Sequence, residues 1–187
     1  MKIIGGKFRG RLLYTPKNRS IRPTNSLTKK AVFDILAHVY PDALNSTRML
    51  DIFAGTGSIG FEALSRGCFY VLFVDNNVDS MRLIRRNSEL LGIKESCDAL
   101  CRNALNLGKI GSSQDPFQFL YLDPPYGQGL AQNVLDIIDK GGWLEYNALV
   151  IVEEYAGIDI DVQSSFKFLQ RRRYGDTQIC FFYYQSI

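Results

Sequence analysis

Residues 117–126 read Phe-Gln-Phe-Leu-Tyr-Leu-Asp-Pro-Pro-Tyr, an apolar run that ends in an acid, two prolines and an aromatic ring. A short apolar run bounded by a turn signal predicts a buried strand before Asp123. Pro124 and Pro125 end that strand because proline has no backbone N–H to continue a ladder. The carboxyl ends of strands in open parallel sheets are where ligands bind. Asp123 and Tyr126 are therefore candidate ligand-binding residues, although a solvated Asp in an ordinary Pro-Pro turn would look the same.

The rest of the chain alternates between strand-like and helix-like patterns. Short apolar runs predict strands at residues 49–53, 70–74, 99–101, 117–122 and 149–152. Apolar residues at helical spacing predict helices at about 26–38, 60–66, 78–91 and 130–140, and a terminal antiparallel pair is expected at 166–173 and 177–184. This alternation favours an α/β fold with a largely parallel sheet. At 187 residues, one domain with a small appendage is expected.

The first part of the chain is strongly basic. Residues 1–33 contain nine Lys or Arg and no Asp or Glu, whereas the remainder carries 13 basic and 19 acidic residues. This asymmetry indicates a basic appendage that meets a polyanion, with a merely solvated basic tail as the alternative. Residues 2–15 are expected to form a β-hairpin or a short β-extension. We therefore predict an extension at 1–40, made of hairpin and helix, and a main domain at 41–187.

Several classes of protein are disfavoured by the composition. No apolar run approaches the length of a membrane span, and the N-terminus lacks the apolar region of a signal peptide. The four cysteines form no Cys-x-x-Cys pair and the chain has one histidine, His38, so no zinc site is expected. We expect a cytoplasmic protein with reduced thiols, no membrane association and no metal.

A glycine-rich turn follows the first expected strand of the main domain. Residues 51–57 read Asp-Ile-Phe-Ala-Gly-Thr-Gly, and with Gly60 the glycines fit the dinucleotide spacing Gly-x-Gly-x-x-Gly. However, Asp51 would repel a pyrophosphate and would suit a cationic ligand. Asp75, at the end of the second strand, is placed to accept hydrogen bonds from ribose hydroxyls. These features favour S-adenosylmethionine, with a glycine turn that only packs a helix as the alternative.

A methyl donor at this edge gives the Asp-Pro-Pro-Tyr turn a chemical role. The exocyclic amine of a nucleobase is conjugated with its ring and is a poor nucleophile. Asp123 can accept one N–H of such an amine and the carbonyl of Pro124 can accept the other, so that the nitrogen lone pair faces the methyl group. Tyr126 can stack on a base that has left its helix or loop.

These motifs carry a resemblance to a known family. Residues 51–58, Asp75 and residues 123–126 resemble class I S-adenosylmethionine-dependent amino-methyltransferases. More narrowly, the sequence resembles the RsmD family at residues 2–11, 22–24, 61–67 and 174–177. That family methylates the exocyclic N2 of a guanine in bacterial small-subunit (16S) ribosomal RNA. The resemblance implies a Rossmann-like fold with a seven-stranded, mostly parallel sheet and a C-terminal antiparallel strand. It also implies S-adenosylmethionine as cofactor and, as partner, 16S ribosomal RNA or an assembly intermediate of the small subunit; a monomer is expected.

The resemblance also assigns roles to individual residues. The catalytic group would be Asp123, Pro124, Pro125 and Tyr126. The donor site would be Asp51, Phe53, Ala54, Gly55, Thr56, Gly57, Asp75, Asn76, Asn103 and Ala104. RNA contacts are expected from Lys7, Arg9, Arg11, Arg22, Thr24, Lys29 and Lys30.

The chain departs from the family pattern at three positions. The family commonly has Asp where this chain has Asn103, and Asp98 offers a competing alignment for the residue against adenine. The family also usually has Arg where this chain has Leu27 and Lys29, so an RNA contact or pocket wall is altered there. Two other functions stay open: methylation of adenine N6 in RNA or DNA, and non-catalytic RNA binding during assembly on the same fold.

Overall fold

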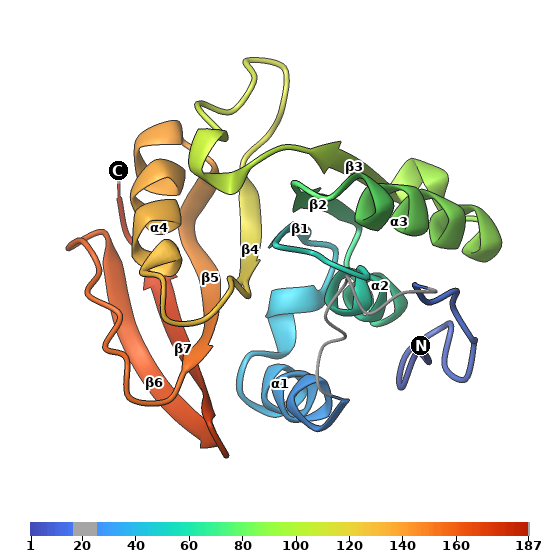
Figure 1. Cartoon of the computed structure of the whole chain (residues 1–187), viewed down its shortest axis with the longest axis horizontal. Coiled ribbons are helices and arrows are strands. Elements are labelled where there is room, and N and C mark those ends of the chain that lie inside the picture. The colour runs from blue at the N-terminus through green and yellow to red at the C-terminus, as the bar shows by residue number, and fades with distance from the viewer. Residues whose placement is uncertain (17–25, 187) are drawn as a thin grey trace.

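The computed structural model describes residues 1–16 and 26–186 and contains one mixed sheet (Figure 1). The strands of this sheet are β1 (Arg48–Ile52), β2 (Tyr70–Asp75), β3 (Cys97–Cys101), β4 (Phe117–Leu122), β5 (Leu144–Tyr155), β6 (Phe166–Tyr174) and β7 (Thr177–Tyr184). They lie in the order β3-β2-β1-β4-β5-β7-β6. The first five pair in parallel, and β7 is antiparallel to both of its neighbours. The expected seven-stranded α/β fold is thus confirmed.

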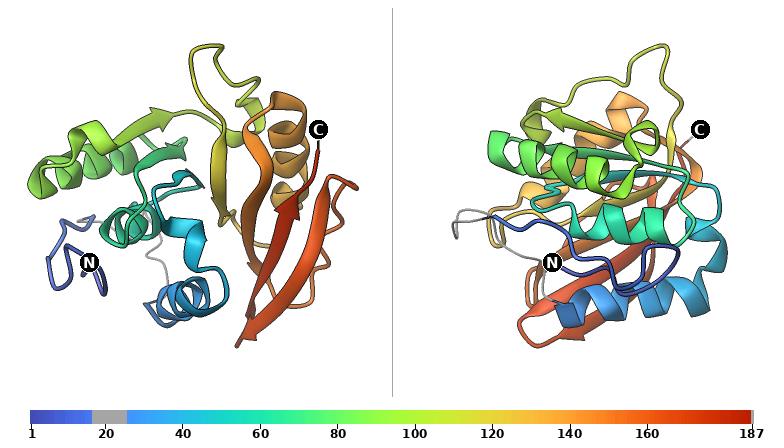
Figure 2. Two further views of the ribbon diagram at one scale, coloured as in Figure 1. Left: turned by 180° about the vertical axis from the view of Figure 1, so that it is seen from behind. Right: turned by 90° about the vertical axis from the view of Figure 1, so that its right-hand side faces the viewer.

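The helices cover the two faces of the sheet (Figures 1 and 2). The α-helices of the described residues are α1 (Ser26–Val39), α2 (Ser58–Ser65), α3 (Val78–Leu91) and α4 (Leu130–Gly141), and short 3-10 turns are η1 (Pro41–Leu44), η2 (Lys94–Ser96) and η3 (Ala104–Asn106). One core cluster joins α1, α2 and α3 to one face of the sheet, and a second joins α4 and η3 to the other.

Alternation along the strands decides which side chains reach each face. Successive strand residues point to opposite faces, so Met49 and Tyr121 pack in the core under α1–α3, whereas Leu50 and Leu122 pack in the core under α4. By the same period, Asp51 and the residue that follows β4, Asp123, belong to the α1–α3 side. The carboxylates at the strand ends therefore gather on one side of the sheet.

Topology places a crevice between β1 and β4. The chain runs from β1 outward through β2 to β3, then crosses back to β4 on the other side of β1. Open α/β sheets bind ligands at this kind of switch point, beyond the carboxyl ends of the strands. The glycine-rich turn after β1 and the Asp-Pro-Pro-Tyr turn after β4 flank that point.

The N-terminal segment is less regular than the expected hairpin. A single antiparallel bridge joins Lys2 to Leu12, and no regular strand is found among residues 1–16. Ile3 and Leu13 are buried in the same core cluster as α1 and α2. The segment is a loop that packs on the main body through this core. The predicted hairpin is confirmed only as the antiparallel bridge that brings the two ends of the loop together.

The sequence underestimated β5. The expected strand covered residues 149–152, whereas β5 continues to Tyr155. Its last part contains Glu153 and Glu154, which are 3% and 1% exposed. Acidic residues are depleted in strands and are seldom fully buried unless paired, so the apolar pattern ended before the strand did.

No helix in residues 1–16 or 26–186 combines the length and apolar character needed to cross a membrane.

Candidate active site

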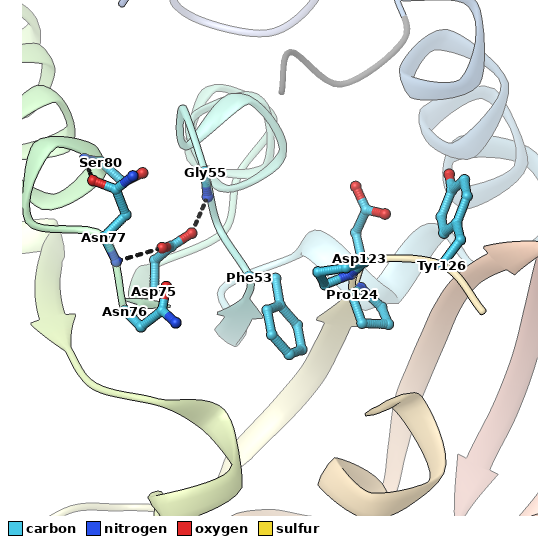
Figure 3. Close-up of a pocket in the computed structure, with 10 residues that line it drawn as sticks. Phe53, Gly55, Asp75, Asn76, Asn77, Ser80, Asp123, Pro124 and Tyr126 are labelled. Carbon is cyan, nitrogen blue, oxygen red and sulfur yellow. Dashed lines mark hydrogen bonds between the residues drawn. The ribbon is translucent and has the colours of Figure 1, made fainter. Parts of the chain in front are cut away.

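A cavity of about 430 Å³ lies at the carboxyl ends of β1, β2 and β4 (Figure 3). Its size falls within the range of small-molecule sites. The expected donor residues that line it are Phe53, Gly55, Asp75 and Asn76, and the expected catalytic residues that line it are Asp123, Pro124, Pro125 and Tyr126. The two predicted sites therefore open into one space, although Asp123 comes 48 positions after Asp75 in the sequence.

Asp75 organises the donor side. Its Oδ2 accepts a hydrogen bond from the Gly55 amide at 2.8 Å, and its Oδ1 accepts one from the Asn77 amide at 2.8 Å. The carboxylate thereby joins the glycine turn to the start of α3. An ionised carboxylate has about four acceptor positions, so each oxygen can still accept from a ligand hydroxyl.

Asp51 lies beneath the turn and does not line the cavity. Its side chain is 2% exposed, and Oδ2 accepts a hydrogen bond from the Gly60 amide of α2 at 3.1 Å. Burial raises the pKa of this carboxyl to about 7, against the lowering effect of that hydrogen bond, and the nearby charge of Asp75 raises the pKa further. Asp51 thus holds the first turn of α2, and any effect on a cationic ligand acts across the turn.

The turn itself has an unusual backbone. Phe53 adopts φ 61°, a left-handed conformation that is rare for a bulky residue. Gly57 adopts φ 74° as the N-cap of α2, and a Cβ there would lie 2.8 Å from the Phe61 ring. Strained residues of this kind cluster at ligand sites, where the surrounding structure enforces them. With this backbone conformation the Phe53 side chain lines the cavity, between Asp75 and Asp123 in Figure 3.

The other expected donor residues lie outside the cavity lining. Thr56 is 4% exposed and its hydroxyl contacts the Met1 sulfur at 3.4 Å, while the Ala54 amide donates to the Val74 carbonyl at 3.1 Å. Ala54, Thr56 and Gly57 shape the turn from behind. Asn103 is exposed and caps η3 by accepting a hydrogen bond from the Leu105 amide at 2.9 Å.

The alternative alignment does not bring Asp98 to the cavity either. Asp98 accepts a hydrogen bond from the Ala99 amide and borders a separate hollow beside α3. Ala104 is buried in the core under α4. Contact of Asn103 or Ala104 with an adenine ring stays a prediction.

Sequence reasoning missed two lining residues, Asn77 and Ser80. Asn77 is the N-cap of α3, and its side chain accepts hydrogen bonds from the Asp79 and Ser80 amides at 2.8 and 3.3 Å. An Asn directly before a helical pattern is a recognised capping signal, so Asn77 could have been found. The helix start lies at the cavity because α3 follows Asp75 after a two-residue turn.

On the acceptor side, Tyr126 is held by a residue that the sequence did not single out. The Tyr126 hydroxyl donates to Oε1 of Glu153 at 2.7 Å and lies 3.3 Å from the Thr177 hydroxyl. Burial raises the pKa of the Tyr126 phenol, with the Glu153 carboxylate adding to the effect. The phenol therefore stays protonated and its ring is anchored at one edge.

The residues that line the cavity fit a nucleoside with a cationic tail. The charged side chains among the described residues that line the cavity are the carboxylates of Asp75 and Asp123. Carboxylates accept hydrogen bonds from hydroxyls and amines and disfavour phosphate. Phe53 adds an apolar ring, and Asn76 and Asn77 add amide groups. Asp75, Phe53 and Gly55 would hold S-adenosylmethionine here.

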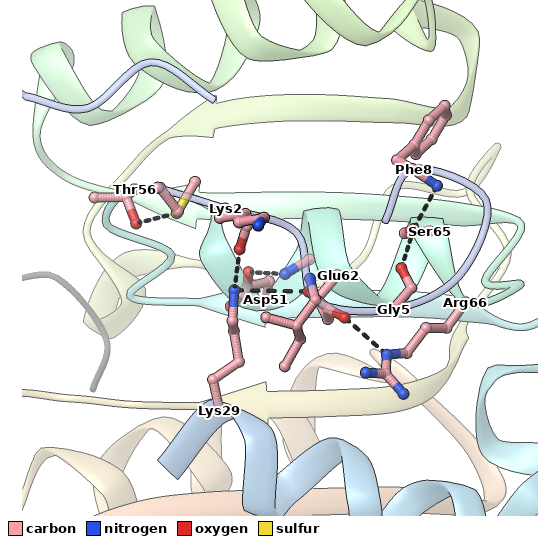
Figure 4. Close-up of polar contacts among 12 residues, drawn as sticks. Lys2, Gly5, Phe8, Lys29, Asp51, Thr56, Glu62, Ser65 and Arg66 are labelled. Carbon is pink, nitrogen blue, oxygen red and sulfur yellow. Dashed lines mark hydrogen bonds and ion pairs between the residues drawn. The ribbon is translucent and has the colours of Figure 1, made fainter. Parts of the chain in front are cut away.

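The basic residues divide into exposed and buried ones. Lys7, Arg9, Arg11 and Lys30 have exposed side chains, and Arg22 and Thr24 lie outside the described residues. Lys29 is 4% exposed; its Nζ donates to the Lys2 carbonyl at 3.1 Å and lies 3.6 Å from Glu62 (Figure 4). In this structure the Lys29 side chain therefore points inward and neutralises a buried carboxylate, and its contact with RNA stays a prediction that this placement does not favour.

The buried carboxylate is Glu62 of α2, which connects three parts of the chain. It is 0% exposed and accepts hydrogen bonds from the Ile4 amide at 2.9 Å and from Arg66 Nε at 2.8 Å, besides its ion pair with Lys29. The N-terminal segment, α1 and α2 thus meet at one charge. The side chain of Ser65 adds to this junction by accepting from the Phe8 amide at 2.9 Å (Figure 4).

A Rossmann-like sheet in the order 3-2-1-4-5-7-6, a glycine turn fixed by Asp75 and an Asp-Pro-Pro-Tyr turn at the same cavity define a class I methyltransferase, whose methyl donor is S-adenosylmethionine. The chain belongs to the RsmD family: the family model described as "Conserved hypothetical protein 95" matches residues 1–183.

Relatives support this assignment over most of the chain. Ribosomal RNA small subunit methyltransferase D of Haemophilus influenzae is 32% identical over 154 residues, which is 82% of this chain and 78% of that protein. The structure of a putative methyltransferase, yhhF, from Escherichia coli covers 100% of this chain and 99% of its own at 25% identity, with a TM-score of 0.85. An RNA methyltransferase from Salinibacter ruber in complex with S-adenosyl-L-homocysteine shares the fold, with a TM-score of 0.64 at 11% identity over 88% of this chain and 95% of that one.

Proposed function

We propose that this protein transfers a methyl group from S-adenosylmethionine to the exocyclic N2 amine of a guanine in 16S ribosomal RNA. The observation that carries the proposal is the single cavity shared by Asp75 and by the Asp123–Tyr126 turn. Relatives named ribosomal RNA small subunit methyltransferase D support ribosomal RNA as the substrate class. The resemblance at residues 2–11 and 22–24 supports guanine as the base.

The residues of this chain supply positioning and electrostatics. Bound S-adenosylmethionine would supply the methyl group from its sulfonium centre, with S-adenosylhomocysteine leaving as a neutral thioether. Asp123 accepts one N–H of the guanine amine, and the Pro124 carbonyl accepts the other. With both N–H groups held, the nitrogen lone pair faces the methyl carbon, and this geometry gives most of the rate gain. Asp123 also stabilises the positive charge that develops on nitrogen, and the nitrogen then loses one proton to Asp123 or to water. Tyr126 stacks on the flipped base.

The N-terminal residues 1–40 act in this proposal as an RNA-contacting extension, and residues 41–187 act as the methyltransferase domain. The Lys7 amide donates to the Ser65 carbonyl at 2.7 Å, at the C-terminal end of α2, while the cavity lies at the N-terminal end. Eight residues of helix separate these ends by about 12 Å. Lys7, Arg9 and Arg11 would then contact phosphates beyond the target nucleotide, on RNA that crosses α2.

Identification of the methylated base tests the proposal. Purified protein is incubated with methyl-labelled S-adenosylmethionine and 16S ribosomal RNA, either free or in partly assembled subunits. The RNA is then digested to nucleosides. We expect N2-methylguanosine as the product. Finding N6-methyladenosine instead would show that adenine is the acceptor and would overturn the proposed guanine specificity. Comparison of the two RNA forms shows which is the substrate, and light scattering tests the expected monomer.

Calorimetry with S-adenosylmethionine addresses the non-catalytic alternative. A methyltransferase must bind the donor, whereas an assembly protein on the same fold need not. Donor binding together with labelled RNA supports the proposal. Failure of the donor to bind would favour the assembly role and would contradict the proposed enzyme.

A further inference from the structure

The turn that follows β4 cannot be held by strand pairing. Pro124 and Pro125 have no backbone N–H, so the ladder between β4 and β5 has no donor from β4 beyond Asp123. The register pairs Leu122 with Val152, the last pair of that ladder. Strand β5 nevertheless continues to Tyr155 because it pairs with β7 there. The end of β5 lies beside the turn, and the described residues 124–127 and 153–155 share no backbone–backbone hydrogen bond.

Two adjacent carboxylates at that end of β5 hold the turn through hydrogen bonds to their side chains. Glu153 Oε1 accepts from the Tyr126 hydroxyl at 2.7 Å, and Glu154 Oε1 accepts from the Gly127 amide at 3.1 Å. Neighbouring strand residues point to opposite faces, so the turn is held from both sides of the sheet.

Glu153 is itself fixed inside the protein. Its second oxygen, Oε2, accepts from the Tyr121 hydroxyl at 2.7 Å, and Tyr121 is a fully buried residue of β4. The side chain of Glu153 thereby links the last part of β4 to the ring that lines the cavity. With both oxygens engaged and 3% exposure, the carboxylate has little freedom to move.

We propose that Glu153 is a positioning residue for the acceptor base, acting through the Tyr126 hydroxyl to hold the ring where the base stacks. This inference rests on the proposed function, because it assigns Tyr126 a base to position. It goes beyond that function by adding a residue of β5 to the acceptor side. The donor side depends on Asp75 and does not involve Glu153, so donor binding is independent of it.

Three single variants and one double variant separate positioning from charge. Tyr126→Phe keeps the ring and removes the hydroxyl, and Glu153→Leu removes both acceptors. We expect each to lower kcat/KM for RNA about 10-fold, mainly through KM, with the donor dissociation constant changed less than about twofold. The double variant should be no worse than the poorer single variant, because both remove the same contact. Glu153→Gln should keep most activity, since its amide oxygen still accepts from Tyr126.

The opposite pattern would overturn the inference. If Tyr126→Phe is fully active while Glu153→Gln is as impaired as Glu153→Leu, Glu153 acts through its charge and not through Tyr126. If Glu153→Leu does not fold, Tyr126→Phe and Glu153→Gln still test the inference, because it requires the first to be impaired and the second to stay active. Absence of RNA methylation by the wild-type protein would refute the proposed function, whereas normal methylation by all variants would refute the positioning role alone.

The chain offers a matched control in Tyr184. Its hydroxyl donates to Asp139 Oδ1 of α4 at 2.8 Å, a phenol–carboxylate contact in a different part of the molecule. Tyr184→Phe should lower thermal stability about as much as Tyr126→Phe and leave kcat/KM for RNA unchanged. Equal losses of activity in both would show that the effect comes from stability.

Discussion

The two halves of the cavity are built by different means, although both depend on carboxylates. On the donor side, Asp51 binds the Gly60 amide in the helix after its own strand. Asp75 binds the Asn77 amide after its own strand and the Gly55 amide in the turn after the neighbouring strand β1. On the acceptor side, the prolines remove the amides, and Glu153 and Glu154 hold the turn from another strand. The donor side is thus held through backbone amides of two adjacent strand–helix units, whereas the acceptor side depends on side chains of β5, whose end pairs with β7.

This difference indicates how each half responds to change. A turn held through several backbone amides keeps its shape when one ligand contact is lost. A turn held by side chains transmits a change in β5 directly to the cavity. The two halves can therefore be disabled separately, and the following experiments test that separation.

The largest expected effect is at Asp123. Asp123→Ala removes the acceptor for one amine N–H and the charge that stabilises the developing cation. We expect methyl transfer to fall about 1,000-fold or more, as for the loss of a key electrostatic contact. Donor affinity by calorimetry should stay within about twofold of the wild type. Substantial activity in Asp123→Ala would remove the proposed role of this residue.

The second effect concerns stability on the donor side. The pKa of Asp51 is raised from 3.8 to about 7, so the folded protein binds a proton that the unfolded chain has released between these pH values. The stability from this group is full below about pH 4 and is lost as pH rises through 7. A rise of this size corresponds to about 4 kcal/mol.

Asp51→Asn tests this dependence, because an amide oxygen still accepts from the Gly60 amide without titrating. Urea unfolding at pH 5 and pH 8 should show a larger loss of stability in the wild type than in the variant. If the free energy of unfolding falls equally in the two proteins, Asp51 is ionised throughout this pH range. That result would contradict burial as the dominant influence on its pKa.

A third, smaller effect is expected at Asp75. Asp75→Asn keeps one acceptor oxygen and places an NH2 group against the Gly55 or Asn77 amide. Loss of a hydrogen bond to a charged group costs about 1.5–3 kcal/mol, so donor affinity should fall about 10–100-fold. RNA affinity, measured by filter binding without donor, should not change. An equal loss of both affinities would show that the two halves are not separable.

The smallest effect is at Lys30, which is exposed and pairs with Asp34 four residues later at 2.5 Å. Lys30→Ala should weaken RNA binding about threefold at physiological salt and change the free energy of unfolding by less than about 0.5 kcal/mol. Its neighbour Lys29 gives the contrast. Lys29→Ala leaves Glu62 without one buried partner and should lower the unfolding temperature, with unchanged RNA affinity of the folded protein. The reverse pattern would mean that Lys29 faces RNA.

Local features of the cavity could be predicted because their causes lie close together in the sequence. The apolar run before Asp123, the two prolines and the glycine turn each define a strand end or a helix start. Asp75 follows from the same pattern one strand later. The fold class also follows, since alternating strands and helices lead to a parallel sheet.

Burial of charged side chains could not be predicted in the same way. Lys29 belongs to a basic stretch. Nothing near it in the sequence indicates that it pairs with Glu62, which lies 33 residues later and is buried in the core. Glu153 and Glu154 interrupt the apolar pattern of β5, so the predicted strand ends where the part that holds Tyr126 begins. In each case the partner of the charge comes from a distant element.

The sequence by itself determined the sheet, the order of its turns and the residue types at its carboxyl edge, because strand and helix periods and turn residues act over short distances. Only the tertiary structure decided that the two turns share one cavity, that Lys29 points inward and that β5 holds Tyr126. Those outcomes depend on which strands pair across the switch point, and pairing between distant segments is set by packing of the whole core.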